Sequence, residues 1–449
     1  MGDATSDSIE VIIPNENDKT VPRCSHGPAL LFERTRNVAQ KGRRFYACSA
    51  CRDRKDCNLF QWEDEKSLWE GVTDRHLEGH VEDPSSQDNN PWEENMEVAN
   101  ERNHEKLQTW QKKAGKLAGK QSRALSKSVV GALSGLQRNI HNWCSPADDL
   151  AEPREISEVR SLAREAQNSS KSPPFTHQEY SSRFLKFVSL PVEQRRFCVD
   201  CQLLILPGEW MNHAKHQALS ENVSVQMLKR PSLLLSPLDN KKSNAQYLFA
   251  DRSCNFLLDV LLGLGFQKFL CVGTPRLHER IKLRNAEGGS PIKSLLLDID
   301  YRFCQFYGQD EFCRYNMFNH HFFDEQEAVT EFKAFLCEEG GAKVIMITDP
   351  PFGGLVKPLA NSFSQISQTW KSVNDESELV EMPIIWTFPY FFESRILEYF
   401  PSFSMLDYQV DYENHPLYKH GMTGRKQSPV RLFTNLSPKG VRLPLDEGY

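Results

Sequence analysis

The sequence predicts an α/β fold built on a mostly parallel sheet, accompanied by two small modules rich in cysteine and histidine. At 449 residues, the chain is too long for a single ordinary core. From about residue 245 onward, short apolar segments alternate with segments of helical period, a pattern typical of a sheet covered by helices on both faces. Clusters of cysteine and histidine precede that region, at residues 24–57 and 198–216. These three observations predict more than one domain.

Apolar runs and helical periods place the expected elements of the α/β domain. We expect helices over residues 251–266 and 324–339. We expect strands at residues 268–273, 294–300, 343–348, 382–388, 408–411 and 430–434. Ligands bind at the carboxyl ends of the strands in such sheets. This rule draws attention to Gly273, Asp298, residues 316–318 and Asp349.

Composition divides the chain into further segments. The stretch at 67–170 is dominated by Gln, Asn, Ser, Glu and Lys and cannot build a core, so we expect a poorly ordered insertion, with a possible lysine-rich helix at 106–136. No apolar run reaches the roughly 20 residues needed to cross a bilayer, and the acidic N-terminus does not resemble a secretory signal. The expected order is a disordered tail at 1–20, a first module at 21–66, the insertion, a second module with connecting helices at 171–240 and the α/β domain at 241–449.

The motif Asp349-Pro350-Pro351-Phe352 follows directly after a buried strand, where active-site loops belong. An exocyclic amine such as adenine N6 is a poor nucleophile, because its lone pair is delocalised into the ring. The Asp349 carboxylate and the Pro350 carbonyl can accept the hydrogen bonds of such an amine, and the prolines fix the carbonyl direction. Phe352 offers a ring on which an extruded base can stack. These residues are therefore the predicted catalytic set.

This motif resembles that of the amino-methylating class of Rossmann-like methyltransferases, in which Asp, Asn or Ser precedes Pro-Pro and an aromatic residue. The resemblance implies S-adenosylmethionine as cofactor and a Rossmann-like methyltransferase domain. Asp298 fits the place of the carboxylate that holds the cofactor ribose, with Asp300 in reserve, and Gly273 would let the chain pass close to the methionine part. The segment departs from the Gly-x-Gly run of many methyltransferases, since Gly273 stands alone.

Two further segments are candidates for contact with the cofactor. One follows the third strand of the domain and would flank the adenine ring, and the other precedes the first helix and would close over the methionine end. They comprise Asn316, Met317 and Phe318, and Gln246, Tyr247, Leu248 and Phe249. For each residue taken singly, packing in the core remains an equal alternative.

The first cysteine cluster resembles a GRF-type zinc finger. A unit of about 45 residues has too little core to fold alone, so a metal would supply the missing stability. Four N and S ligands suit tetrahedral zinc, and Cys51 is a spare thiol that can replace one of them. The expected ligands are Cys24, His26, Cys48 and Cys57.

The second cluster resembles a C2H2 finger, although only two residues separate its histidines, fewer than usual. A spacing of three places both imidazoles on one side of a helix. The apolar stretch at 203–207 indicates packing against the catalytic domain, so we expect a structural zinc site. Its ligands would be Cys198, Cys201, His213 and His216.

Basic residues gather beside the first cluster and near the C-terminal end, although the net charge is −6. Local basic patches with aromatic neighbours suit phosphates and single-stranded bases. Two solvated loops remain the alternative on charge alone. The candidate RNA-binding residues are Arg43, Arg44, Tyr46, Lys419, Arg425 and Lys426.

Stretches 44–57, 245–254 and 418–421 together resemble zinc-finger-bearing ribosomal-RNA N6-adenosine methyltransferases; the insertion at 67–157 has no part in the resemblance. It implies large-subunit ribosomal RNA as substrate, two or more structural zinc ions, and ribosome-biogenesis or RNA-processing proteins as partners. It also implies a nucleolar and nuclear location, with the cytoplasm as a further compartment. A non-catalytic RNA-binding scaffold with a degenerate methyltransferase fold stays open at this stage. Cytosine N4 and a glutamine amide also stay open, since they share the chemistry of the clamp.

Overall fold

A computed structural model describes most of the α/β domain and both cysteine-rich modules. The described residues are 8–13, 20–35, 42–51, 57–64, 173–216, 218–219, 222–238, 246–288, 291–353, 355–374, 381–415 and 428–444. The chain divides into two compact units, and the one discussed below comprises 11–33, 43–66 and 161–449. The insertion at 67–170, including its expected helix, lies outside the described residues. The expected disordered tail is described at residues 8–13 and 20, and residues 8–12 of it form a strand.

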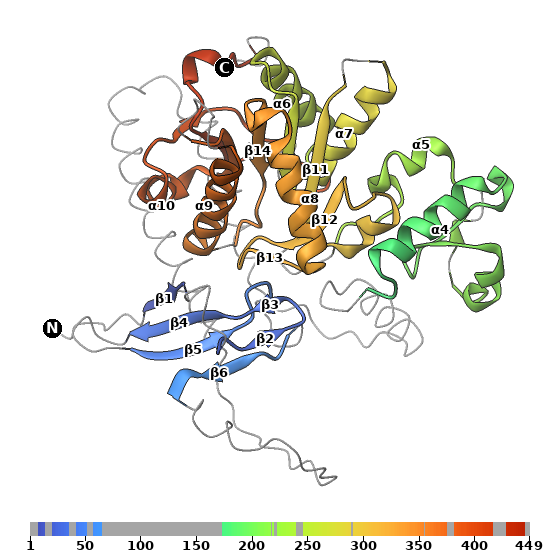
Figure 1. The fold of residues 1–449 in the computed structure, drawn as a ribbon, viewed down its shortest axis with the longest axis horizontal. Helices are drawn as coiled ribbons and strands as arrows, with labels where there is room; N and C mark the ends of the chain where they lie inside the picture. The colour runs from blue at the N-terminus through green and yellow to red at the C-terminus, as the bar shows by residue number, and fades with distance from the viewer. Residues whose placement is uncertain are drawn as a thin grey trace, which may run out of the picture. The chain divides into compact units, whose positions relative to one another are not determined.

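The α/β domain is built on an eight-stranded, mostly parallel sheet (Figure 1). Its strand order is β13-β12-β11-β10-β14-β15-β17-β16, with β17 antiparallel to both of its neighbours. The strands are β10 (Lys268–Val272), β11 (Lys293–Asp298), β12 (Phe312–Asn316), β13 (His321–Phe322), β14 (Val344–Thr348), β15 (Ile384–Pro389), β16 (Ser404–Leu406) and β17 (Val430–Thr434). The order reverses direction between β10 and β14, so the carboxyl ends of these two strands form the crevice in which such sheets bind ligands.

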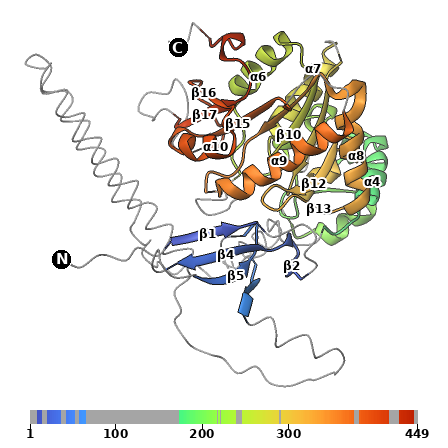
Figure 2. The same ribbon diagram turned by 60° about the vertical axis from the view of Figure 1, so that its left-hand side comes forward.

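Two apolar layers cover the two faces of this sheet. Alternate side chains of the parallel strands point to opposite faces, so every central strand is buried along its whole length. Helices α6 (Asp251–Gly263) and α7 (Pro275–Ala286) pack on one face. Helices α8 (Glu325–Cys337), α9 (Val356–Val373) and α10 (Glu393–Tyr399) pack on the other, as Figures 1 and 2 show. The predicted fold class is confirmed.

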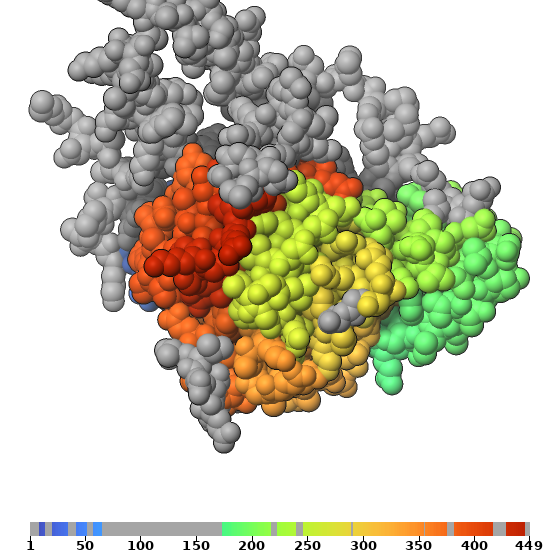
Figure 3. Space-filling view, turned by 90° about the horizontal axis from the view of Figure 1, so that it is seen from above, coloured from blue at the N-terminus to red at the C-terminus, as the bar shows by residue number. Residues whose placement is uncertain are grey.

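Most of the predicted elements of the domain are present within a few residues of their expected bounds. The strand expected at 408–411 is wrong: these residues pair only loosely, with Val410 N–H donating to Val430 O at 3.3 Å. The chain therefore passes along β17 without joining the sheet. After β17, the chain lies beside the end of α6, where Gly440 is close to Leu264, and the two surfaces adjoin in the space-filling view (Figure 3). Among the described residues, no helix has the length and apolar character to span a membrane.

The first module is a small antiparallel sheet in the order β1-β4-β5-β6 with a short β2-β3 hairpin beside it. Its strands are β1 (Ser8–Ile12), β2 (Arg23–Cys24), β3 (Gly27–Pro28), β4 (Leu30–Thr35), β5 (Arg43–Ala47) and β6 (Phe60–Trp62). Stacked rings fill its interior, with Phe45 lying 5.3 Å from Phe32 and 5.0 Å from Phe60 between centroids. This core is small, which is the condition under which a metal contributes most to folding.

The second module combines helix α4 (His177–Ser189) with a three-stranded sheet and a 3₁₀ helix. The strands are β7 (Arg196–Cys198), β8 (Leu203–Ile205) and β9 (Ala218–Leu219), and the 3₁₀ helix is η3 (Pro207–His213). Helix α4 begins at a capping box, in which Thr176 and Glu179 satisfy each other's backbone N–H groups. Two short helices follow, α5 (Val225–Leu228) and η4 (Pro231–Leu233). The buried side chains of this module join the core that covers α6 and α7.

Candidate active site

Asp349 lies in the crevice at the centre of the sheet, directly after β14. Its backbone N–H donates to Val272 O at 3.2 Å, which ties the catalytic loop to the end of β10. Gly273 follows β10 with φ +66°, and a Cβ there would stand 2.7 Å from Met317 Cε and 3.3 Å from Asp349 O. The backbone therefore needs glycine at this point. The loops that follow β10 and β14 are therefore in direct contact at the crevice.

Two hydroxyl groups orient the Asp349 carboxylate. Thr387 Oγ1, near the end of β15, donates to Asp349 Oδ1 at 2.6 Å, and Tyr412 OH donates to the same oxygen at 2.8 Å. Within the described residues, no donor is recorded for Asp349 Oδ2. This oxygen therefore remains as the acceptor for a ligand. The sequence did not point to Thr387 or Tyr412.

The same environment changes the acidity of Asp349. Burial raises its pKa from 3.8 to about 7, while the hydrogen bonds from Thr387 and Tyr412 oppose the rise. Since both donors hold Oδ1, a proton on the neutral acid would reside on Oδ2 and convert that oxygen from acceptor to donor. The carboxylate accepts a hydrogen bond through Oδ2 only when it is ionised.

Aromatic rings gather around this carboxylate. The Tyr247 ring lies 5.6 Å from that of Phe352 and 4.3 Å from that of His415, between centroids. Phe352 meets Tyr412 edge to face at 5.6 Å. The predicted residues Tyr247 and Phe352 are thus brought together, with Tyr412 and His415 as members that the sequence did not indicate. Such rings suit a planar base held beside Asp349.

Residues 246–250 are held against residues 411–414 by backbone and side-chain hydrogen bonds. Leu248 N–H donates to Asn414 Oδ1 at 2.8 Å, and Asn414 Nδ2 donates back to Gln246 O at 2.8 Å. Phe249 pairs with Tyr412 in an antiparallel bridge and is 2% exposed. Leu248 and Phe249, two of the four residues expected near the cofactor in this segment, therefore pack in the core, which was the alternative left open for them.

Gln246 also faces the loop after β11. Its Nε2 lies 3.5 Å from Asp300 Oδ2, and its Oε1 accepts from Leu238 N–H at 3.0 Å. Asp300 forms a buried two-point ion pair with Arg302, at 2.8 Å and 2.7 Å. The reserve candidate Asp300 is thereby occupied by a structural partner.

Asp298 ends β11 on the same edge of the sheet. Its Oδ1 accepts from Asp300 N–H at 2.9 Å, and no partner is recorded for Oδ2 within the described residues. Burial, and then the negative charge of Asp300, raise its pKa to about 7. An oxygen with unused acceptor capacity is what the hydroxyl groups of a ribose require, so Asp298 fits the predicted role in cofactor binding.

The segment at the end of β12, residues 316–318, differs from its expected role. Asn316 Nδ2 donates to His26 O and to Ser49 Oγ, both at 2.8 Å, so its amide binds the first module and is not directed at a cofactor. Phe318 is 6% exposed and packs in the core beneath the sheet. Met317 alone reaches the crevice, over Gly273. The expectation for Asn316 and Phe318 is corrected: docking of the first module takes up the amide of Asn316.

The first module brings its four predicted ligands together, with all ligand atoms within 4.8 Å of one another. His26 Nδ1 lies 3.6 Å from Cys24 Sγ and 3.4 Å from Cys48 Sγ. Bonds of about 2.0–2.3 Å to a tetrahedral zinc give ligand separations of about 3.3–3.8 Å, so Cys24, His26, Cys48 and Cys57 fit zinc. Cys51 Sγ lies instead at the other imidazole nitrogen, 3.5 Å from His26 Nε2.

The second module likewise brings Cys198, Cys201, His213 and His216 within 4.8 Å of one another. His216 Nδ1 lies 3.6 Å from Cys198 Sγ and 3.2 Å from Cys201 Sγ. His213 ends the 3₁₀ helix η3, and the turn that follows continues its i to i+3 pattern, with His216 N–H donating to His213 O at 2.9 Å. This geometry accounts for the short spacing between the histidines, and the donor set fits zinc.

Both modules are anchored to segments that follow strands of the catalytic sheet. Asn319 Nδ2 donates to Pro28 O of the first module at 2.8 Å. In the second module, Leu204 N–H donates to Gln305 Oε1 at 2.9 Å, and Arg302 Nη1 donates to Gln202 Oε1 at 3.2 Å. The expected packing of residues 203–207 against the catalytic domain is present.

The predicted RNA-binding residues divide into three groups. Arg43 pairs with Asp64 at 3.0 Å and lies over the Trp62 ring, but its side chain is half exposed. Arg44 pairs with Glu33 at 3.0 Å. Tyr46 is 4% exposed and packs in the module's core, so the expectation that it stacks on RNA is corrected. Lys419, Arg425 and Lys426 lie outside the described residues.

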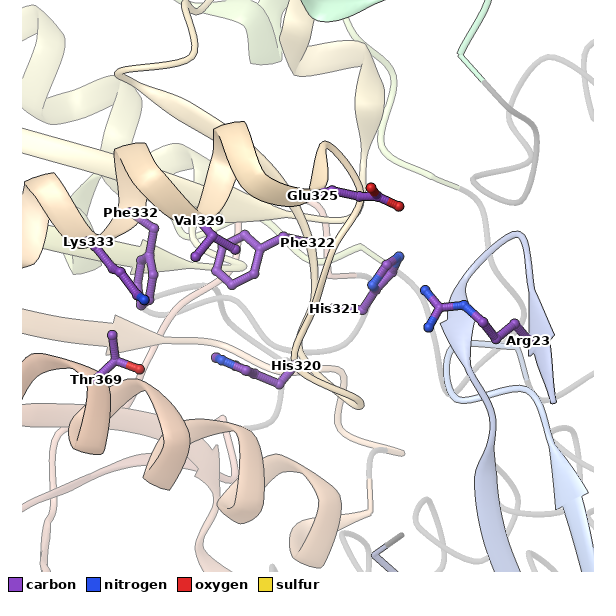
Figure 4. A pocket seen from close by; sticks show the side chains of 9 residues that line it. All are labelled: Arg23, His320, His321, Phe322, Glu325, Val329, Phe332, Lys333 and Thr369. Atoms are coloured by element: carbon purple, nitrogen blue, oxygen red, sulfur yellow. The ribbon is translucent and has the colours of Figure 1, made fainter. Parts of the chain in front are cut away.

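A separate pocket of about 430 Å³ lies between the first module and the helical face of the catalytic domain. Figure 4 shows Arg23 of the module pointing toward His321, with Glu325 beside them. Burial lowers the pKa of His321 to about 4, so its ring is neutral at neutral pH. The pocket shares no residue with the crevice at Asp349, so it belongs to the junction with the first module.

Comparison with known proteins agrees with this arrangement. The family described as "Probable N6-adenine methyltransferase" matches residues 240–435, and the GRF zinc finger family matches residues 22–66. The chain is 47% identical over 449 residues to rRNA N(6)-adenosine-methyltransferase ZCCHC4 of Xenopus tropicalis, covering 100% of this chain and 74% of that protein. It is 46% identical over 449 residues to the protein of that name in Xenopus laevis, covering 100% and 73%. It is 47% identical over 446 residues to the one in Homo sapiens, covering 99% and 69%.

Proposed function

The chain belongs to the rRNA N6-adenosine-methyltransferase family, and from this premise we propose that it methylates the N6 amino group of an unpaired adenosine in large-subunit ribosomal RNA. The observation that carries the proposal is the Asp349 carboxylate, which is held through Oδ1 and keeps Oδ2 as an acceptor. The scaffold alternative is not favoured, because a binding protein has no need of a carboxylate oriented by two hydroxyl groups at this crevice.

The residues at the crevice activate the amine by accepting its hydrogen bonds. The N6 amino group donates one N–H to Asp349 Oδ2 and the other to the backbone carbonyl of Pro350. These two acceptors disfavour delocalisation of the nitrogen lone pair into the ring and leave it available for attack. Pro350 and Pro351 fix the backbone φ, so the carbonyl is oriented before the substrate arrives.

The rings hold the base while the amine reacts. The target adenine leaves its stack and lies beside Tyr247 and Phe352. As the new N–C bond forms, the nitrogen becomes positively charged and must lose one proton. Asp349 Oδ2 is hydrogen-bonded to that proton, and its pKa, raised to about 7, enables it to accept the proton.

S-adenosylmethionine, when bound, supplies the methyl group from a positively charged sulfur. Gly273, Met317 and Asp298 are the residues that would hold it, since they face the crevice from the ends of β10, β12 and β11. Asp298 carries an oxygen without a recorded partner there, and at Gly273 the backbone leaves no room for a side chain.

Ribosomal RNA as substrate follows from family membership, and the large subunit from the resemblance described above. A substrate made during ribosome assembly implies work in the nucleolus and nucleus, and contact with ribosome-biogenesis or RNA-processing proteins. We propose both. Imaging of the tagged full chain against a nucleolar marker tests the location, and exclusion from the nucleus would contradict it.

The substrate is tested with labelled S-adenosylmethionine and purified large- and small-subunit ribosomal RNA, followed by nucleoside analysis. We expect labelled N6-methyladenosine in large-subunit RNA, and none with Asp349→Ala. Label in cytidine or in protein would contradict the proposed target. Circular dichroism of Asp349→Ala, matched to the wild type, would establish that the variant keeps its fold.

A further inference from the structure

The two most exposed aromatic side chains among the described residues are adjacent in the chain. Tyr390 is 50% exposed and Phe391 is 54% exposed, and their rings meet edge to face at 5.6 Å. Large aromatic side chains are usually buried or half-buried, so two neighbouring exposed rings require an explanation. We call Tyr390 and Phe391 the aromatic shelf.

The structure holds the aromatic shelf firmly in place. Tyr390 N–H donates to Pro429 O at 2.9 Å, which continues the pairing between β15 and β17. Phe391 packs on Phe392 at 5.1 Å, and Phe392 packs on the buried Phe388 at 4.9 Å. The exposed rings therefore stand on a fixed base, and little conformational entropy is lost when a ligand stacks on them.

The aromatic shelf lies at the edge of the sheet that carries the active site. It follows β15, whose Thr387 donates to the Asp349 carboxylate, and leads into α10. Tyr390 comes three residues after Thr387, a separation of roughly 10 Å along an extended chain. Strand β15 and helix α10 lie beside β17 in Figure 2. Because the shelf continues the strand that holds Thr387 at the active site, a polymer bound at the active site is the ligand that would reach it.

We propose that the aromatic shelf stacks the unpaired nucleotide next to the target adenosine in the RNA. This proposal rests on RNA being the substrate. Extrusion of the target base leaves its neighbour without a stacking partner, and an aromatic ring replaces the lost contact. Every base has a π-face, so the shelf binds without reading sequence. Arg395, exposed and one helical turn after Phe391, has no ion pair recorded among the described residues and is placed to meet a phosphate.

The test compares Tyr390→Ala, Phe391→Ala and the double variant with wild type. The matched control is Tyr399→Ala, because Tyr399 is an exposed aromatic at the far end of α10. We expect KM for RNA to rise by about 5- to 150-fold for each stacked base lost. Affinity for S-adenosylhomocysteine should stay unchanged, and Tyr390→Trp should restore the KM for RNA. The control should behave as wild type.

A direct reading comes from 2-aminopurine placed on either side of the target adenosine. Stacking on the shelf quenches its fluorescence on binding to wild type, and the double variant should lose that quenching. Equal KM and equal quenching in wild type and double variant would overturn the proposal. So would a loss of self-association in the double variant, measured by analytical ultracentrifugation, with RNA binding intact, since the shelf would then join two copies of the chain.

Failure of the proposed function gives a different pattern. If wild type binds RNA through the shelf but methylates no adenosine, the shelf stands and the proposed reaction is wrong. If wild type neither binds nor methylates RNA, both are overturned. Methylation of RNA that is independent of the shelf overturns the shelf alone.

Discussion

Replacement of Tyr412 by phenylalanine should shift the pH dependence of methyl transfer toward alkaline pH. The change removes one hydroxyl and keeps the ring that packs on Phe352 at 5.6 Å. Asp349 Oδ1 then loses a hydrogen bond of 2.8 Å that favours its ionised form. Because the amine needs Oδ2 as an acceptor, only the ionised enzyme is active. Activity is therefore present above the pKa of Asp349 and is lost as the pH falls through it.

The size of the shift follows from the strength of the lost hydrogen bond. A hydrogen bond to a charged group contributes about 1.5–3 kcal/mol. One pKa unit corresponds to about 1.4 kcal/mol, so the pKa of Asp349 should rise from about 7 by roughly one to two units. At pH 7 the ionised fraction would fall from about one half to about one tenth or one hundredth. The rate should fall by roughly 5- to 50-fold at pH 7 and recover to within about twofold of wild type at pH 9.

The assay is the pH–rate profile of kcat/KM for RNA, with saturating S-adenosylmethionine, from pH 5.5 to 9.5. Tyr408→Phe is the matched control, because Tyr408 is also fully buried in the same segment and stacks on Phe256 at 3.8 Å. Its profile should keep the acid limb of wild type. The reasoning is refuted if Tyr412→Phe lowers the rate by the same factor at every pH, since the hydroxyl would then act through packing of the base and not through the Asp349 pKa.

Three further predictions test the environment of the site. Asp349→Asn should gain stability relative to wild type as the pH rises from 4 to 8, by at most about 4 kcal/mol. The reason is that the raised pKa makes the native carboxyl stabilising only while it is protonated. Thermal unfolding that shows the same difference between variant and wild type at pH 4 and at pH 8 would contradict this. Asn316→Ala should weaken the affinity for S-adenosylhomocysteine, measured by calorimetry, several-fold, because Met317 over Gly273 loses its fixed position. Equal affinity in variant and wild type would show that the first module does not influence cofactor binding. Zinc chelation, or Cys48→Ser, should unfold the first module, as followed by intrinsic tryptophan fluorescence, and lower the affinity for RNA, as followed by titration. Unchanged fluorescence and unchanged RNA affinity would argue against a structural metal.

Local signals in the sequence were sufficient for the architecture of the catalytic domain. The strands β14 and β17 are short, largely apolar runs, so the predicted runs at 343–348 and 430–434 correspond to them. The position of Asp349 after such a run is a property of the chain alone. The clusters of cysteine and histidine are also local, which is why their members could be grouped before the fold was known.

The partners of Asp349 could not be found in this way. Tyr412 donates to a residue 63 positions earlier in the chain, from a segment with no regular period. Thr387 lies in a fully buried strand, where a threonine in the sequence indicates only core packing. Tyr46 shows the opposite failure: its basic neighbours suggested exposure, but both faces of β5 are covered at residues 45–47, and Tyr46 is buried with them. Contacts between distant segments, rather than composition, decide these cases.

Asn316 links the first zinc module to the strand that borders the cofactor crevice. Asn316, the last residue of β12, was expected at the cofactor, yet its amide donates to the backbone carbonyl of His26, a predicted zinc ligand. The next residue, Met317, touches the crevice at Gly273. After the neighbouring strand β11, Arg302 donates to Gln202 of the second module and pairs with Asp300, which in turn lies beside Asp298. Each module thus forms hydrogen bonds with the segment at the end of one strand of the crevice. A small domain folded around a metal provides a rigid support for these segments at the edge of the sheet.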